Sequence, residues 1–214
     1  MSAAVINLYE EKLFRSYDKI GNAIIDYINN MDLSWKIELA RQIYFENYTM
    51  SSNLLLKYKP FIQWLIFSYK IHNDNTLIDC IYENYINNMC SYEKSALISL
   101  KNTYESLYKV YSIKNDIVLV KDVFLNTSIE LSDKTLAHKV KRYSGIFMRI
   151  VTINGKNMAI PGYCVMSNNI LKKTQLYVKN SFNEFTKVKK DITIHNFINL
   201  NNLLLHKQFL NYRI

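Results

Sequence analysis

The sequence predicts an α+β protein with a helical N-terminal half, a small antiparallel β-barrel or coiled sheet, and a helical C-terminal tail. Apolar residues recur every three or four positions up to residue 106, and then every second position between Leu107 and Ser167. Only four glycines and two prolines occur in 214 residues, which favours long helices with few tight turns. We therefore expect three modules, at residues 1–106, 107–167 and 168–214.

The first module is predicted to contain five or six helices joined by short polar turns. Residues 3–30 carry one continuous helical stripe of apolar side chains. In the next helix, residues 34–48, Ser34 is a candidate N-cap, and the stripe formed by Trp35, Leu39 and Ile43 is expected to be buried, with Ile37 and Tyr44 as further candidates for burial. Further helical stripes follow at residues 53–60, 61–71, 76–89 and 91–106.

From Leu107 the chain reads as about five short strands with hairpin connections. Residues 114–116 and 126–127 are predicted turns, because Asn and Asp tolerate a left-handed backbone. Residues 142–153 form a longer run of β-formers, and Asn154-Gly155 is the strongest hairpin signal in the chain. Strands with this spacing are typical of a small antiparallel barrel or a strongly coiled sheet.

The last module returns to helical periodicity. Asn168 or Asn169 can cap a helix that begins near residue 170, and residues 192–209 again show a helical apolar stripe. The pattern of residues 182–190 fits no single class.

The net charge of +9 is concentrated in one half of the chain. Residues 1–100 hold nine Lys or Arg and eleven Asp or Glu, a net charge of −2, whereas residues 101–214 hold eighteen and seven, a net charge of +11. Such an asymmetry indicates a polyanionic partner for the basic half, and a solvated surface that keeps the protein soluble is the alternative.

Several classes of protein are disfavoured by the sequence. The three cysteines form no CxxC pair, which argues against a disulfide framework and for a cytoplasmic location. The four histidines lack paired ligands at close spacing, so neither a metal site nor a cofactor is expected. No apolar run approaches the roughly 20 residues that a membrane-spanning helix needs, and no signal peptide is expected.

Two segments of the β-region, VKDVF at residues 120–124 and GIFMRIV at residues 145–151, resemble elements of a known family. They are similar to the "LRDLLTG"-like and "GDLLFARLV"-like strands of bacterial proteins that often carry a C-terminal SEC-C zinc motif. The resemblance covers roughly residues 95–167 and implies a fold, not an activity. No cysteine follows Cys164, so the zinc motif is absent and zinc binding is not implied.

Basic and aromatic residues alternate in and beside the β-region. Small barrels bind nucleic acids by combining a basic groove with aromatic stacking platforms. The expected function is therefore non-enzymatic binding of a nucleic acid or nucleoprotein. The candidate binding residues are Lys109, Tyr111, Lys121, Lys139, Lys141, Arg142, Tyr143, Arg149, Lys172 and Lys173.

Two alternative functions remain open. The slightly acidic helical half is rich in tyrosine, which is enriched at protein interfaces, so the chain could be an adaptor or inhibitor that docks on a larger protein. Carboxylates at Asp116, Asp122, Glu130 and Asp133 lie near lysines in the sequence and could hold Mg²⁺ in a nuclease. The oligomeric state does not follow from the sequence.

Overall fold

The computed structural model describes residues 3–46, 58–153 and 155–211, and it confirms the α+β class. Helices lie at both ends of the chain, and a six-stranded sheet lies between them. The chain forms two compact units, one of residues 1–55 and 64–102 and the other of residues 56–63 and 103–214. The helix expected to begin near Asn53 starts outside the described residues.

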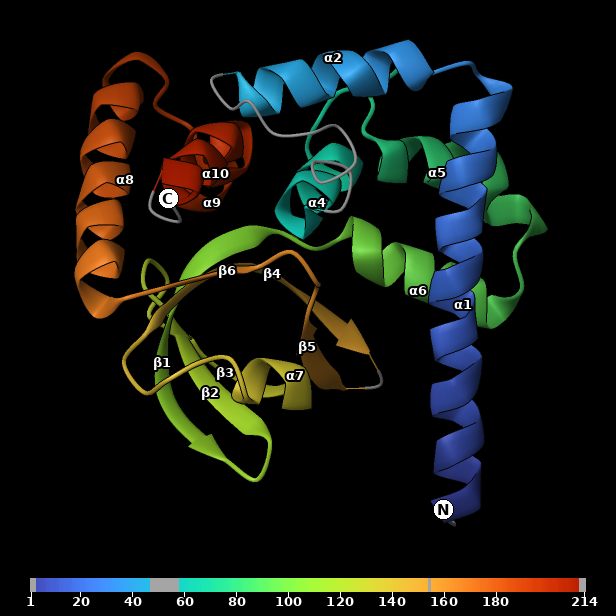
Figure 1. Ribbon diagram of the computed structural model, residues 1–214, viewed down its shortest axis with the longest axis horizontal. Helices are drawn as coiled ribbons and strands as arrows, with labels where there is room; N and C mark the ends of the chain where they lie inside the picture. Colours follow the sequence, from blue (N-terminus) through green and yellow to red (C-terminus); the bar gives the residue numbers. More distant parts are fainter. Residues whose placement is uncertain (1–2, 47–57, 154, 212–214) are drawn as a thin grey trace. The chain divides into compact units, whose positions relative to one another are not determined.

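The first unit is helical (Figure 1). Within it, α1 packs against α5 and α6, and its core is made of aliphatic and aromatic side chains such as Ile20, Tyr44 and Leu97. Thr76 caps α5 with a reciprocal capping box to Asp79. The unit contains α1 (Ala3–Asn30), α2 (Ser34–Phe45), α5 (Leu77–Tyr85), the 3-10 helix η1 (Ile86–Asn88) and α6 (Ser91–Lys101), while α4 (Lys59–Phe67) contributes residues to both units.

The buried face of α2 differs from the one that the sequence predicts. Trp35, Leu39 and Ile43 are 61%, 42% and 37% exposed, whereas Tyr44 and its neighbour Phe45 are buried. The buried pair Ala40 and Tyr44 has the same spacing of four residues as the exposed pair Leu39 and Ile43. Periodicity alone therefore cannot tell which face of the helix is buried. The expected burial of the Trp35 stripe was therefore wrong. The N-cap residue is Leu33, and Ser34 is the first helical residue.

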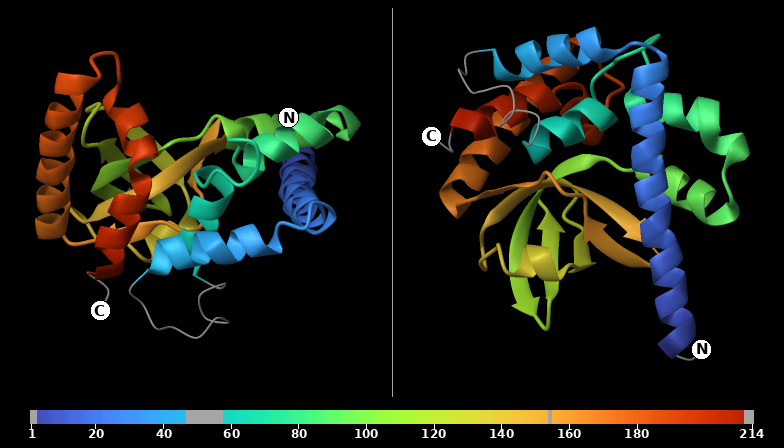
Figure 2. Two further views of the ribbon diagram at one scale, coloured as in Figure 1. Left: turned by 90° about the horizontal axis from the view of Figure 1, so that it is seen from above. Right: turned by 45° about the vertical axis from the view of Figure 1, so that its right-hand side comes forward.

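The second unit contains the sheet, whose strands are short and strongly coiled (Figure 2). Its strands are joined in the order β1-β2-β3-β5-β4-β6, and β1 also pairs with β4. The strands are β1 (Glu105–Lys114), β2 (Ile117–Asp122), β3 (Ser128–Ser132), β4 (Gly145–Ile153), β5 (Lys156–Ala159) and β6 (Cys164–Met166).

The β1–β4 pairing closes the first five strands into a ring. Strand β1 makes this possible because its first half pairs with β4 and its second half with β2. The ring is weakest between β3 and β5, which meet in parallel at the single residue pair Leu131 and Asn157. The sheet is therefore mixed: it is the expected coiled sheet and not a fully antiparallel barrel.

The sheet has a separate core on each face. Inside the ring, Tyr108, Val110 and Val120 pack with Leu136 of the short helix α7 (Lys134–Ala137), which follows β3. On the outer face, Leu107 and Phe147 pack against three C-terminal helices. These helices are α8 (Asn168–Val188), α9 (Ile194–Leu200) and α10 (Asn202–Asn211).

The predicted turns of the β-region are present. Asn115 and Asp116, with φ of 49° and 63°, join β1 to β2 in the left-handed pair that a two-residue hairpin requires. Asn126 has φ of 62° in the next turn. The hairpin from β4 to β5 turns at Gly155, with φ of 73°, while Asn154 lies outside the described residues.

The C-terminal tail contains a longer first helix than expected. Helix α8 is capped by Ser167, whose hydroxyl accepts from the Ile170 amide, and it continues through residues 182–188. Neither Asn168 nor Asn169 is the N-cap residue. In the described part of the chain, no helix combines the length and the apolar character that crossing a membrane requires.

Candidate nucleic-acid interface

Five of the ten candidate residues lie together on the outer face of β1 and β2 and in the turn before β4. We call this set, Lys109, Tyr111, Lys121, Arg142 and Tyr143, the basic–aromatic patch. The Lys109 ammonium lies 5.8 Å from the centre of the Tyr111 ring and 5.5 Å from that of Tyr143. The Lys121 ammonium is 5.9 Å from the Tyr111 ring, and the Arg142 guanidinium is 4.7 Å from the Tyr143 ring. Each ring therefore has two cations beside it.

A β-bulge in β1 brings Tyr111 into this patch. Lys109 pairs with Lys121 of β2, which places both side chains on one face of the sheet. The register then shifts between Val110 and Ser112, and Tyr111 is the extra residue. Bulges change the direction of side chains and are common beside functional sites. Here the bulge leaves the Tyr111 ring 40% exposed, next to the two lysines.

The turn before β4 supplies the other two residues. Tyr143 has φ of 68°, which is uncommon for a large side chain, and its amide donates to the Val110 carbonyl at 2.8 Å. The Ser144 hydroxyl donates to the Lys141 carbonyl at 2.6 Å, and Arg142 Nε donates to the Tyr111 carbonyl at 3.1 Å. These bonds hold the turn against the bulged part of β1, so the patch has a fixed backbone.

The cations of the patch are not neutralised by the protein itself. Across the described residues, no carboxylate forms an ion pair with Lys109, Lys121 or Arg142, nor with the neighbouring Lys141. Their charge is available to an external anion, because a surface cation without an internal partner keeps its full attraction for one.

The other surface candidates lie beside this patch or apart from it. Lys141 is exposed in the same turn as Arg142. The Lys139 ammonium lies 5.7 Å from the ring of Tyr163, in a separate cation–π pair. Lys172 and Lys173 are exposed on the first turns of α8, with no contact to the patch residues among the described interactions.

Arg149 is not a surface residue, and its place among the candidate binding residues was wrong. It lies in the middle of β4, directly opposite Glu105 of β1, and is only 4% exposed. Its Nη2 lies 3.7 Å from Glu105 Oε2, and its Nη1 donates to the Thr103 carbonyl at 2.7 Å. A buried guanidinium is tolerated only when a carboxylate and hydrogen bonds compensate for lost hydration, and Arg149 has both.

Glu105 is the centre of a buried polar cluster that sequence reasoning missed. Its Oε2 accepts from Asn202 Nδ2 at 3.2 Å, and its Oε1 lies 3.2 Å from His206 Nε2. Burial alone would raise the pKa of Glu105, but His206, Arg149 and Asn202 outweigh it and hold the pKa below its usual value. The cluster ties β1 and β4 to α10. One signal pointed to it: Arg149 is a lone charge within the otherwise apolar run GIFMRIV.

The carboxylates named for the nuclease alternative are not gathered into a site. Asp122 is fully buried, its Oδ1 accepts from the Phe124 and Leu125 amides, and its Oδ2 lies 3.3 Å from His195 Nε2. Asp133 caps α7 by accepting from the Leu136 amide. Among the residues that the structure describes, no three His, Cys, Asp or Glu are placed to hold a metal ion together.

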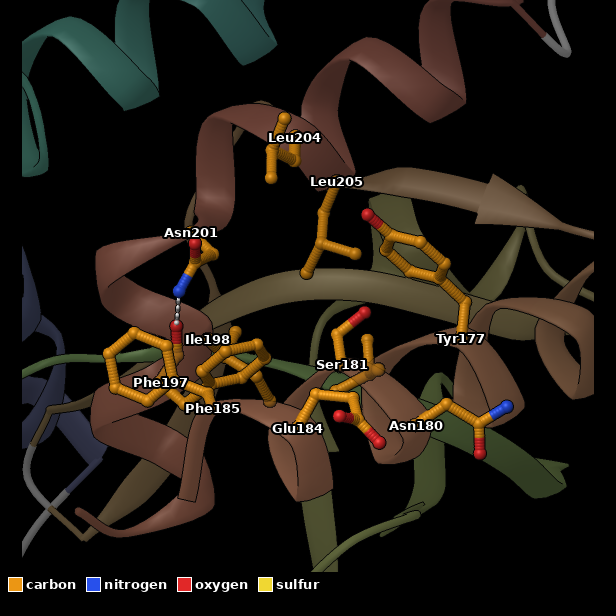
Figure 3. A pocket seen from close by; sticks show the side chains of 11 residues that line it. Tyr177, Asn180, Ser181, Glu184, Phe185, Phe197, Ile198, Asn201, Leu204 and Leu205 are labelled. Carbon is orange, nitrogen blue, oxygen red and sulfur yellow. Dashed lines mark hydrogen bonds between the residues drawn. The ribbon is translucent and has the colours of Figure 1, made fainter. Parts of the chain in front are cut away.

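A cavity of about 570 Å³ lies between α8 and the helices α9 and α10 (Figure 3). Phe185, Phe197 and Leu205 line its apolar part, and Ser181 and Glu184 of α8 line its polar part. The carboxylate of Glu184 is paired with Lys187 at 2.6 Å. No Lys or Arg is among the described residues that line the cavity, and none of these residues belongs to the basic–aromatic patch.

Comparisons with known proteins give a family but no function. No curated protein and no solved structure matches the chain. One family model matches residues 10–207, which include all of the strands and most of the helices. The chain thus belongs to a family of unknown function (DUF7986).

Proposed function

We propose that the protein binds a nucleic acid or nucleoprotein, without catalysis, through the basic–aromatic patch. The observation that carries this proposal is the alternation of cations and exposed rings within one rigid surface, with Lys109 placed between Tyr111 and Tyr143. Cations attract phosphates, and aromatic rings offer stacking surfaces to bases. A solvated basic surface needs the lysines alone and gives no reason for the rings or for the positive φ of Tyr143.

The topology supports the proposal by analogy. A five-stranded ring in the order β1-β2-β3-β5-β4, closed by β1 and β4 and with a helix between β3 and β4, has the connectivity of an OB-fold. That partly open barrel binds oligonucleotides or oligosaccharides over the face of its second and third strands. A fold does not determine a function, so the charge of the patch decides between these ligands and favours the polyanion.

The proposal is tested by measuring the salt dependence of oligonucleotide binding. The double variant Lys109→Ala with Lys121→Ala should weaken binding and make the slope of log K against log salt shallower. Each phosphate contact contributes about 0.7 to this slope with single strands and about 0.9 with duplex DNA, so the loss of two contacts changes it by about 1.4 or about 1.8. The melting temperature should stay near that of the wild type, because both lysines are only partly buried and surface charges without an ion pair add little stability.

The matched control removes two positive charges from the first unit. Arg15→Ala with Lys94→Ala lowers the net charge by the same amount but leaves the patch intact. It should retain the wild-type slope. Equal slopes for the two double variants would show that only the total charge matters, and the patch would then not be a binding site.

A second candidate function is protein interaction, which the exposed stripe of α2 favours. Trp35, Leu39 and Ile43 present one apolar face to solvent, and large exposed apolar patches mark interaction sites. Of the tyrosines in this unit, Tyr44 is a weaker candidate, because it is only 1% exposed, and Tyr48 lies outside the described residues. A photoreactive amino acid at position 39 should capture one partner in cells, and the same group at exposed position 26 should not. Identical products from both positions would count against this function.

A further inference from the structure

Tyr111 and Tyr143 form a pair of rings whose separation is bounded by their shared neighbour. Because the Lys109 ammonium lies 5.8 Å from one ring centre and 5.5 Å from the other, the two centres are no farther apart than the sum of these distances. Both rings remain substantially exposed, at 40% and 46%. A few successive nucleotides of one strand are therefore enough to reach both rings.

The backbone that carries the two rings is held in place by the fold. Tyr111 is the extra residue of the bulge, and Tyr143 occupies a left-handed conformation that two backbone bonds to Val110 maintain, at 2.8 and 2.9 Å. Conformations of this kind cost energy and are found preferentially at ligand clamps. A backbone that is already ordered loses little entropy when a ligand binds, which strengthens binding.

From this arrangement we infer that the patch recognises single-stranded nucleic acid, with bases stacked on Tyr111 and Tyr143 and phosphates held by Lys109, Lys121 and Arg142. In a duplex the faces of the bases are stacked on one another, and a protein meets only their edges and the phosphates. The two rings would then have no binding partner. Every base of a single strand has a free π-face, so stacking on tyrosine tolerates any sequence.

This inference rests on the proposed function and adds to it the strandedness of the ligand. It also distinguishes a nucleic acid from an acidic peptide as the ligand. An acidic peptide would bind the three cations but would make no use of the two rings. The chemistry is the same for DNA and RNA, because neither phosphates nor base faces distinguish them.

The test compares two tyrosine variants of the full-length chain on two ligands. A labelled 20-nucleotide single strand of mixed sequence and its duplex are titrated by fluorescence anisotropy. Tyr111→Leu with Tyr143→Leu should weaken single-strand binding by roughly 5- to 150-fold for each base that loses its stack, and should leave duplex binding unchanged. Tyr111→Phe with Tyr143→Phe keeps both rings and should bind the single strand like the wild type.

The lysine variants make the two possible failures distinguishable. If Lys109→Ala with Lys121→Ala weakens binding but the leucine variant does not, nucleic-acid binding stands and single-strand stacking is overturned. Duplex binding as tight as single-strand binding by the wild type also overturns it. If polyglutamate competes as well as an oligonucleotide of equal charge, the patch binds any polyanion, and single-strand stacking is overturned. No binding of any oligonucleotide at low salt refutes the proposed function itself.

A second measurement covers the case in which the leucine variant does not fold. In Tyr143→Trp the indole stands in the place of the phenol ring. Its fluorescence, taken as the difference from the wild type, should be quenched by the single strand and not by inorganic polyphosphate, because only a base can stack on it. Equal quenching by both ligands would contradict stacking.

Discussion

Glu105 connects the sheet to helix α10 through its side-chain contacts. It is fully buried, and it faces Arg149, Asn202 and His206. Removing one member of a buried ion pair leaves the other charge without compensation. The cluster therefore makes the stability of the second unit depend on one carboxylate.

Glu105→Gln should lower the free energy of unfolding by about 3 kcal/mol at pH 7, because it leaves the Arg149 charge uncompensated. Since the pKa of Glu105 is lowered in the folded state, its contribution is fully present above the unfolded pKa of about 4.3 and is lost as the pH falls through the lower folded pKa. The difference between variant and wild type should thus shrink below about pH 4.

Chemical denaturation between pH 3 and pH 7 measures this difference, with Glu130→Gln as the control. Glu130 is an exposed residue of β3, and its loss should have almost no effect at any of these pH values. A deficit of Glu105→Gln that stayed constant down to pH 3 would show that the charge of Glu105 is not what stabilises the fold.

Single residues also show where sequence reasoning succeeds and where it stops. The turns at residues 115–116 and 126 follow from local backbone preferences, and the sequence predicted them correctly. The burial of Arg149 depends on its register with Glu105, 44 positions away in the chain, and no local pattern contains that information. The grouping of Lys109, Tyr111 and Tyr143 likewise depends on a bulge and a positive φ that periodicity does not reveal.

At the scale of elements, the contact between α8 and β4 requires a residue without a side chain. A Cβ atom on Gly145 would lie 2.7 Å from Leu171 Cβ and 2.7 Å from Met166 Cγ. Gly145→Ala should therefore destabilise the protein by about 1–3 kcal/mol through overpacking. Gly21→Ala is the matched control, because nothing lies within 4 Å of its site on α1.

The control should change stability in the opposite direction. Alanine in the middle of a helix is favoured over glycine by about 0.5–1 kcal/mol, so Gly21→Ala should raise the melting temperature while Gly145→Ala lowers it. Thermal unfolding followed by circular dichroism compares the two variants directly. No loss of stability in Gly145→Ala would mean that the α8–β4 contact is not as tight as described.

Helix α2 gives a second test at this scale. Trp35→Ala should change stability by no more than about 0.5 kcal/mol, because the side chain is exposed. Tyr44→Ala should cost about 3–5 kcal/mol, because the ring is 1% exposed and packs against Phe45 and Trp64. Denaturant titration measures both. The reverse order of the two effects would mean that the Trp35 face is buried, as expected from the sequence.

For the whole molecule, the sequence predicted the order of helical and β segments because periodicity is a local property. It did not predict which strands meet. The β1–β4 pairing and the parallel contact of β3 with β5 join segments that are far apart in the chain, and together they turn a series of hairpins into a ring. The same closure brings the turn at residues 141–144 against β1, and so it assembles the basic–aromatic patch.

The central claim, that this patch is the nucleic-acid interface, is tested most directly by mapping where an oligonucleotide touches the full-length chain. The wild-type protein is mixed at low salt with a single strand that carries a photoreactive base, irradiated, digested and analysed by mass spectrometry. We expect the cross-linked peptides to contain Tyr111 or Tyr143, and the cross-links to disappear in Lys109→Ala with Lys121→Ala. Cross-links confined to residues 3–101, or a yield that the lysine substitutions leave unchanged, would contradict the claim.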